Sequence, residues 1–291
     1  MRFRWRFGAP LVLAVSAWVA LTPATVTATS VPTNVKPSVA DAANDVEVIS
    51  TNGCRLPQNR TAVRTDCIYG DTAGAKKVAL VGDSHAAALF QPLNALAKQN
   101  HWKLNIQTKI SCRFVDLPLM YLGSEYSQCE QWRLNVITYL KAHPQDLVIF
   151  VVARRMTALP SRPGDDDPAV QGHALARLMT QIPGKHVVIV DTPYAYYDVP
   201  KCLANHMNNY EACATTRDQA FDGTRNKVLE STAVADDPNA TLVNLSTNIC
   251  PLGTYCQPVL NGYIVMRDNL HMTKTFARTL APALGSKLPS F

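Results

Sequence analysis

From residue 77 onward, short continuous apolar runs alternate with segments in which apolar residues recur every three or four positions. Continuous apolar runs that end in turn residues are typical of strands buried on both faces, whereas the recurrence predicts amphipathic helices. The runs predict five strands, at 77–82, 103–108, 147–153, 186–191 and 241–245. The recurrence predicts helices at 86–99, 130–142, 174–182, 215–235 and 273–284.

Strands that alternate with helices imply a parallel sheet covered on both faces. We therefore expect an α/β fold, namely a three-layer α/β/α, flavodoxin-like domain around a five-stranded parallel sheet. In such sheets ligands bind beyond the carboxyl ends of the strands. The residues just after Val81, Ala153, Asp191 and Leu245 are therefore the places to search for a site.

The first thirty residues have the pattern of an export signal and not of a folded domain. Arg2, Arg4 and Arg6 precede an apolar run at 9–21, and small residues at 26–28 resemble a cleavage site. The run is shorter than the roughly 20 residues that span a bilayer comfortably, although an uncleaved anchor is the alternative. We expect 1–29 to be a signal peptide or signal anchor, 30–50 a flexible linker and 51–291 one catalytic domain, secreted or membrane-anchored but extracytoplasmic.

The net charge and the cysteine content of the sequence argue against some classes of function. The formal net charge of +6 includes the three leader arginines, so a processed chain carries about +3, which is too mild to indicate a nucleic-acid partner. Eight cysteines in an exported chain predict disulfides, and the absence of any Cys-x-x-Cys argues against a metal site. Eight cysteines allow 105 connectivities. Pairing of sequence neighbours is favoured because each pair brackets a loop: Cys54–Cys67, Cys112–Cys129, Cys202–Cys213 and Cys250–Cys256.

The sequence Gly82-Asp83-Ser84-His85 stands where the first predicted strand meets the first predicted helix. A serine at this position lies beside unpaired backbone N–H groups, which can stabilise a developing oxyanion. Asp83 and Ser84 are equally typical of residues that only cap a helix. On its own, the motif leaves both interpretations open.

A second motif near the carboxyl terminus favours the catalytic interpretation. Asp268 and His271 are three residues apart in a predicted turn before the last helix. This spacing can place the carboxylate against one imidazole nitrogen, which leaves the other free to accept the proton of Ser84. Without Ser84, an exposed capping histidine would be the better interpretation of His271.

These two motifs resemble the SGNH (GDSL-like) hydrolase superfamily. The resemblance is closest to the SGNH domain associated with acyltransferase-3 membrane proteins, which has GDSH in place of GDSL and a YRDxxHLS-like ending. This chain has GYIVMRDNLHMT at 262–273, preceded by Cys250-Pro251 and Cys256. The stretches beginning at Cys67 (CIYG) and Cys112 (CRF) also match, so the resemblance covers about 54–284.

The resemblance implies an SGNH hydrolase fold and serine chemistry on O-acyl esters of carbohydrates, without a cofactor. Ser84 would be the nucleophile, His271 the general base and then acid, and Asp268 the orienting carboxylate. We expect transfer of an O-acyl group, in particular O-acetyl, to a cell-envelope glycan or glycolipid, with a membrane acyltransferase-3 protein as donor partner. The alternatives are an O-acetyl or carbohydrate esterase, a lipid hydrolase, and a non-catalytic glycan-binding or partner-docking module.

The residues at the positions of the oxyanion donors differ from those of the wider superfamily. SGNH enzymes in general supply a glycine after the second strand and an asparagine after the third. This chain has Lys109-Ile110-Ser111-Cys112 at the first place and Arg154 at the second. Since the acyltransferase-linked subgroup also tends to carry arginine there, we expect the Ser84 backbone N–H and the Arg154 side chain to share the oxyanion, although Arg154 can equally be a structural ion-pair former.

Overall fold

The computed structural model describes residues 29–155, 158–225 and 227–291. The five predicted strands lie side by side and parallel, in the spatial order β4 (Trp102–Lys109), β3 (Lys76–Gly82), β7 (Leu147–Val151), β9 (Lys185–Ile189) and β11 (Ala240–Val243). Numbered along the chain, this is the flavodoxin-like order 2-1-3-4-5. The predicted three-layer α/β/α fold is confirmed.

Two short strands extend the sheet beyond β4. β1 (Arg55–Leu56) pairs in parallel with the carboxyl end of β4, and β2 (Ile68–Gly70) pairs antiparallel with its first half. The described sheet therefore has seven strands, two more than predicted. Segments of two and three residues are too short to carry a recognisable alternation, since most strands have about five or six residues.

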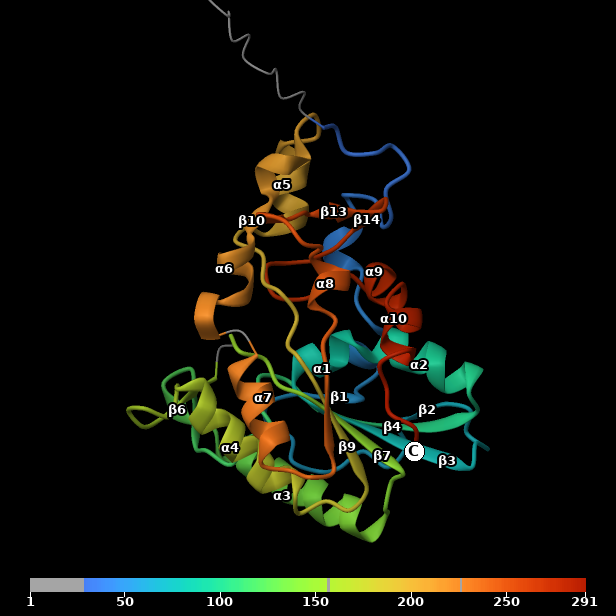
Figure 1. The fold of residues 1–291 in the computed structure, drawn as a ribbon, viewed down its shortest axis with the longest axis vertical. Coiled ribbons are helices and arrows are strands. Elements are labelled where there is room, and N and C mark those ends of the chain that lie inside the picture. Colours follow the sequence, from blue (N-terminus) through green and yellow to red (C-terminus); the bar gives the residue numbers. More distant parts are fainter. Residues whose placement is uncertain (1–28, 156–157, 226) are drawn as a thin grey trace, which may run out of the picture.

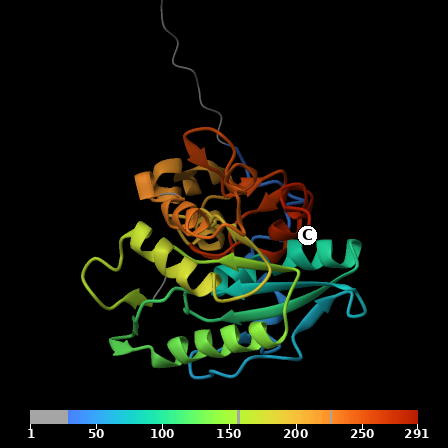
Figure 2. The same cartoon turned by 60° about the horizontal axis from the view of Figure 1, so that its bottom comes forward.

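The sheet is covered on both faces, as Figures 1 and 2 show. Successive side chains of a strand point to opposite faces, so Leu80 and Ile149 pack in one core while Val81 and Phe150 pack in the other. The first core includes α1 (Ser84–Ala88), α2 (Phe90–Gln99), α9 (Lys274–Arg278) and α10 (Ala281–Gly285). The second includes α3 (Ser127–Ala142), α4 (Pro168–Met179) and α7 (Val228–Ala235).

Short elements lie beyond the sheet, at the top of Figure 1. They are α5 (Val199–Asn205), β10 (Thr215–Thr216), α6 (Arg217–Phe221), α8 (Ser246–Ile249), β12 (Tyr255–Cys256), β13 (Val259–Leu260) and β14 (Tyr263–Ile264). A separate small sheet contains β5 (Leu119–Tyr121), β6 (Ser124–Glu125) and β8 (Leu159–Pro160). Single 3-10 turns occur at Ala42–Asn44, Val48–Ser50, Tyr210–Cys213 and Gly223–Arg225.

Three predicted helices are interrupted in the structure, and each break has a local cause. The segment 86–99 divides at Leu89 into α1 and α2, because Pro92 has no N–H to continue the hydrogen-bond series. The segment 273–284 divides between α9 and α10, where Pro282 has no N–H to continue the hydrogen-bond series. The segment 215–235 was predicted as one helix, which is wrong. Asp222 ends α6 and Lys227 precedes α7, both in the left-handed region, with φ of 61° and 65°.

The segment 30–50 is not a free linker but packs on the domain. Val31, Ala42 and Ile49 are buried in the first core. The Asp45 carboxylate accepts a hydrogen bond from the backbone of Thr275 at 2.8 Å, and Lys36 pairs with Tyr263 of β14. The predicted leader at 1–29 lies outside the described residues except for its last position. No helix of the described part is long and apolar enough to cross a membrane.

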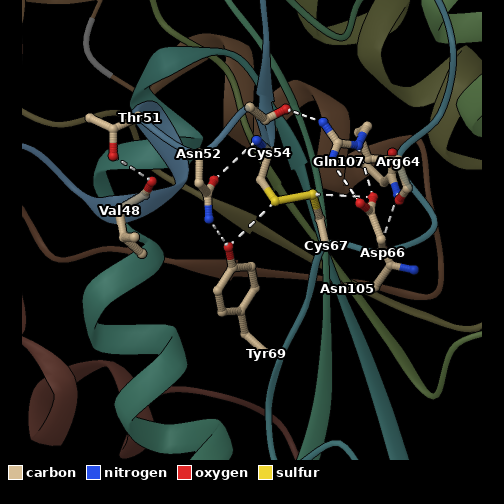
Figure 3. The surroundings of a disulfide bond; sticks show 11 residues. Val48, Thr51, Asn52, Cys54, Arg64, Asp66, Cys67, Tyr69, Asn105 and Gln107 are labelled. Carbon is tan, nitrogen blue, oxygen red and sulfur yellow. Dashed lines mark hydrogen bonds and ion pairs between the residues drawn. A yellow bond between two sulfur atoms is a disulfide. The ribbon is translucent and has the colours of Figure 1, made fainter.

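All four predicted disulfides are present: Cys54–Cys67, Cys112–Cys129, Cys202–Cys213 and Cys250–Cys256. Figure 3 shows the first, which joins the residues just before β1 and β2. The Tyr69 hydroxyl donates to the Cys54 sulfur at 3.4 Å and accepts from the Asn52 amide at 2.7 Å. This disulfide therefore fastens the added edge strands to each other.

Candidate active site

Ser84 follows β3 at the point where the strand order of the sheet reverses, between β4 and β7. Sheets of this kind bind ligands at such a switch point. The chain reaches Ser84 through Gly82, whose φ is 152° and where a Cβ would lie 2.1 Å from the Val151 carbonyl oxygen. Glycine is therefore needed for β3 to pack this closely beside β7 and still deliver Ser84 to the end of the sheet.

Asp83 caps α1 and also ties it to the neighbouring strand end. One carboxylate oxygen accepts from the His85 N–H and the other from the Ala153 N–H, each at 2.8 Å. Asp83 is fully buried, and this burial raises the pKa of its carboxyl group. Asp83 thus has the capping role, while Ser84 is the first residue of the helix. The N–H of Ser84 is among the donors that a helix leaves without an intrahelical partner.

His271 meets Ser84 from the opposite end of the chain. Its Nε2 lies 2.9 Å from Ser84 Oγ, and its Nδ1 lies 2.9 Å from Asp268 Oδ2. The turn is held by Asp268 Oδ1, which accepts from the backbone N–H groups of Leu270 at 2.6 Å and His271 at 2.7 Å. The structure therefore brings together all three residues that the sequence singled out.

The electrostatics suit a neutral imidazole beside an ionised carboxylate. Burial would raise the pKa of Asp268, but the hydrogen bond with His271, the charge of His271, the Leu270 N–H and the charge of Arg267 together lower it to about 2. Burial lowers the pKa of His271, and the charge of His85 lowers it further, against the effect of Asp268. With the carboxylate at Nδ1, that nitrogen carries the proton and Nε2 is left to accept one from Ser84.

A second, buried histidine–aspartate pair lies under the first and was not predicted. His85 Nδ1 is 2.6 Å from Asp191 Oδ1, and both side chains are almost completely buried. Asp191 follows β9 and lies directly before the residues that the rule on strand ends marked for search. The partner of His85 could not be found from spacing because 106 residues separate the two.

The Arg154 side chain is turned towards this second pair. Its Nη2 donates to the carbonyl oxygen of Thr192 at 3.2 Å, and its Nε lies 3.7 Å from Asp191 Oδ2. Among the described residues, no hydrogen bond joins the guanidinium to Ser84. The assignment of Arg154 to the oxyanion therefore stays a prediction.

The tyrosines after β9 differ in exposure. Tyr194 is buried and donates its hydroxyl to Asp191 at 2.5 Å, so its ring is not exposed to a ligand. Tyr196 and Tyr197 are exposed.

One group of side chains has the spacing of metal ligands, namely Cys202, His206 and Cys213. The two cysteine sulfurs form a disulfide and thus lack the thiolates that a metal requires.

The chain resembles solved structures of other proteins. A solved structure of the periplasmic domain of a lipopolysaccharide acetyltransferase from Salmonella ser. Paratyphi A is similar, with a TM-score of 0.63 and 18% identity. The match covers 87% of this chain and 97% of that one, and it supports the fold. A carbohydrate esterase family 2 enzyme with a carbohydrate-binding domain, from Corynascus thermopiles (Myceliophthora fergusii), matches at a TM-score of only 0.39. That match has 12% identity and covers 74% of this chain and 67% of the other.

No curated protein sequence matches the chain significantly. The family described as the SGNH domain (fused to AT3 domains) matches residues 53–286, which include Ser84, Asp268 and His271. The match spans most of the chain, from just before the first disulfide to the end of the last helix. The chain therefore belongs to the family of SGNH domains that occur fused to AT3 domains.

Proposed function

We propose that the chain transfers an O-acyl group, in particular O-acetyl, to a cell-envelope glycan or glycolipid through an acyl-enzyme on Ser84. The observation that carries the proposal is the continuous series Ser84 Oγ, His271 Nε2, His271 Nδ1 and Asp268 Oδ2, with 2.9 Å at each hydrogen bond. These are the distances at which a base can take a proton from a nucleophile and be oriented by a carboxylate.

In the first half-reaction, Ser84 Oγ attacks the carbonyl carbon of an acyl donor while its proton passes to His271 Nε2. The bond between the acyl carbon and the donor's leaving atom then breaks, and the leaving group takes the proton from His271. Asp268 stabilises the imidazolium that forms in between. The backbone N–H of Ser84 is one donor for the oxyanion, and Arg154 is the second donor proposed.

In the second half-reaction, a sugar hydroxyl gives its proton to His271 and attacks the acyl-serine. The new sugar ester leaves as Ser84 Oγ recovers its proton. Hydrolysis follows the same steps with water as the acceptor, so the outcome depends on whether the site holds a sugar and excludes water. Family membership favours transfer, since these domains occur fused to AT3 domains.

The proposed setting is outside the cytoplasm. Four disulfides support this location, because they persist in oxidising compartments. The similar Salmonella protein is the periplasmic domain of a lipopolysaccharide acetyltransferase, which is consistent with a glycan or glycolipid acceptor. A membrane acyltransferase-3 protein is the proposed source of the acyl group.

Fluorophosphonate labelling tests the nucleophile. The wild-type chain should become labelled, while Ser84→Ala should not, and His271→Ala should react at least about 10³-fold more slowly. His143→Ala, which removes an exposed histidine whose ring bonds the Tyr139 carbonyl oxygen of α3, is the matched control and should label normally. Labelling that survives Ser84→Ala would remove the serine from the reaction.

A second experiment separates transfer from hydrolysis. The chain is incubated with an acetyl ester and increasing concentrations of a glycan acceptor, and both free acetate and acetylated glycan are measured. Transfer predicts that acetylated glycan rises at the expense of acetate. Release of acetate alone at high acceptor concentration indicates an esterase. If Ser84→Ala leaves activity in cells intact and the chain still binds glycan, the chain is a non-catalytic binding or docking module.

A further inference from the structure

In the Gly82–His85 motif, Gly82 and Asp83 have structural roles and Ser84 is the proposed nucleophile, which leaves His85 without a role. It follows the nucleophile directly, yet its side chain is buried under the site and makes a 2.6 Å hydrogen bond through Nδ1 to Asp191. Its backbone N–H donates to Asp83. The burial of the ring and its bond to Asp191 keep it from turning towards a substrate.

Asp191 is arranged to remain ionised in this buried position. Its Oδ1 accepts from His85 and from the Thr192 N–H at 2.8 Å, and its Oδ2 accepts from the Arg154 N–H at 2.9 Å and from the Tyr194 hydroxyl. Four donors satisfy a buried carboxylate, which otherwise would be costly to keep charged. A fully bonded carboxylate favours the imidazolium form of the histidine that faces it.

The His85 ring contacts the ring of the proposed base. The centroids of His85 and His271 are 5.2 Å apart, with an angle of 60° between the planes. The centroid of the His85 ring also lies 5.9 Å from that of Tyr194. The His271 ring thus lies against an imidazole that Asp191 holds in place.

We propose that His85 is a positioning residue for the reaction: held by Asp191, it supports the His271 ring and keeps a fixed positive charge beside it, so that His271 stays unprotonated and ready to act as base. This inference rests on the proposed function of Ser84 and His271. It assigns a role to the fourth residue of the motif and to the acidic residue after β9.

The charges around both histidines agree with this role. His85 faces Asp83, Asp191 and Arg154, and burial, which opposes its protonation, is outweighed by Asp191, so the pKa of His85 is raised. His271 faces Asp268, Arg267 and His85, and its pKa is lowered by burial and by the charge of His85. Removing the His85 charge should therefore raise the pKa of His271. As the pH falls, His271 should then become protonated, and stop acting as a base, at a higher pH than in the wild type.

The chain contains a matched control pair at the other end of the same strand. His186 Nδ1 lies 2.5 Å from Asp237 Oδ2, with both side chains buried, at the amino end of β9. This pair resembles His85–Asp191 in chemistry and burial, but it has no contact with His271. Any general cost of removing a buried histidine–aspartate pair should appear equally in the two.

The test is an NMR titration of the imidazole signals of His271 in the wild type, His85→Asn and His186→Asn. Asparagine places an amide N–H where Nδ1 was, so the hydrogen bond to Asp191 can persist without the charge. We expect His85→Asn to raise the pKa of His271 by about one pH unit, with no change in His186→Asn. The acid limb of kcat/KM should move by the same amount. An unmoved His271 titration in folded His85→Asn would overturn the proposal.

Asp191→Asn provides an independent variant if His85→Asn does not fold. Without the carboxylate His85 becomes neutral, so the pKa of His271 should rise again, but by less because the negative charge is lost as well. No change, or a fall, in this variant also overturns the proposal. Since the titration needs no substrate, its failure is distinguishable from failure of the acyl-transfer proposal, which is decided by labelling of Ser84.

Discussion

The site contains two histidine–aspartate pairs that are built in different ways. His271 and Asp268 are three residues apart in one turn, with 16% and 30% of their side chains exposed. His85 and Asp191 are 106 residues apart, and their side chains are 2% and 0% exposed. The first pair has a ring nitrogen that faces Ser84, and the second has its ring enclosed by the end of the sheet.

This difference in exposure suits two different tasks, acting as a general base and holding a fixed charge, which a single pair could not perform together. A general base has to reach its proton and change charge during the reaction, which requires an accessible ring nitrogen. A fixed charge has to remain in place, which burial and four donors to Asp191 provide. The comparison predicts that substitutions in the outer pair, His271 and Asp268, lower the reaction rate. Substitutions in the inner pair, His85 and Asp191, should instead shift the pH dependence of that rate.

The largest effect is expected for His271 and for Ser84, the proposed nucleophile. Ser84→Ala and His271→Ala should each lower kcat/KM by at least about 10⁴-fold, and the double substitution should cost little more than either one, because the residues act as a unit. Steady-state kinetics on an acetyl ester would measure this. Additive losses would show that the two side chains act separately.

Asp268→Asn should lower kcat/KM by about 10² to 10⁴-fold, because the amide no longer fixes the imidazole tautomer or stabilises the imidazolium. Asp237→Asn, in the pair at the amino end of β9, should leave the rate within about twofold. A similar loss in both variants would indicate general destabilisation instead of a role at the site. Circular dichroism would confirm that both variants are folded.

The arginine beside the inner pair allows a sharper comparison. If Arg154 donates to the oxyanion, Arg154→Ala should slow acyl-enzyme formation by about 10²-fold. Arg267→Ala, which removes the arginine bonded to Asp268 at 3.1 Å, should have a smaller effect because Arg267 acts only through Asp268 and His271. Burst kinetics would report both. Unchanged acylation in Arg154→Ala would remove the oxyanion assignment and leave Arg154 as a structural partner of Asp191.

The smallest effect concerns stability in acid. The pKa of Asp268 is lowered to about 2 in the folded chain, below the roughly 3.9 of an unfolded aspartate. Its ionised form therefore stabilises the fold above about pH 4, and this contribution is lost as the pH falls from 4 towards 2. After allowance for partial exposure it amounts to about 1–2 kcal/mol. Urea unfolding at pH 7 and pH 3 should show a smaller difference in Asp268→Asn than in wild type.

Much of the fold and the outer pair could be predicted from sequence because the signals are local. Apolar runs at strand length identified the five central strands, and the three-residue spacing of Asp268 and His271 identified a pair that one turn can form. The four disulfides join cysteines only 6 to 17 residues apart, so nearest-neighbour pairing succeeded. The helix at 215–235 failed because apolar spacing does not reveal that Asp222 and Lys227 adopt left-handed backbone angles.

By itself the sequence determined the alternation of strands and helices, the position of Ser84 after a buried strand, and the local pairing of Asp268 with His271. Only the tertiary structure decided that Ser84 meets His271 across 187 residues and that Asp191 is the partner of His85. The physical reason is that helix, turn and strand signals depend on neighbours in the chain. Contacts between strand ends depend instead on the order in which β3, β7 and β9 pack, which places Asp83, Arg154 and Asp191 at one edge of the sheet.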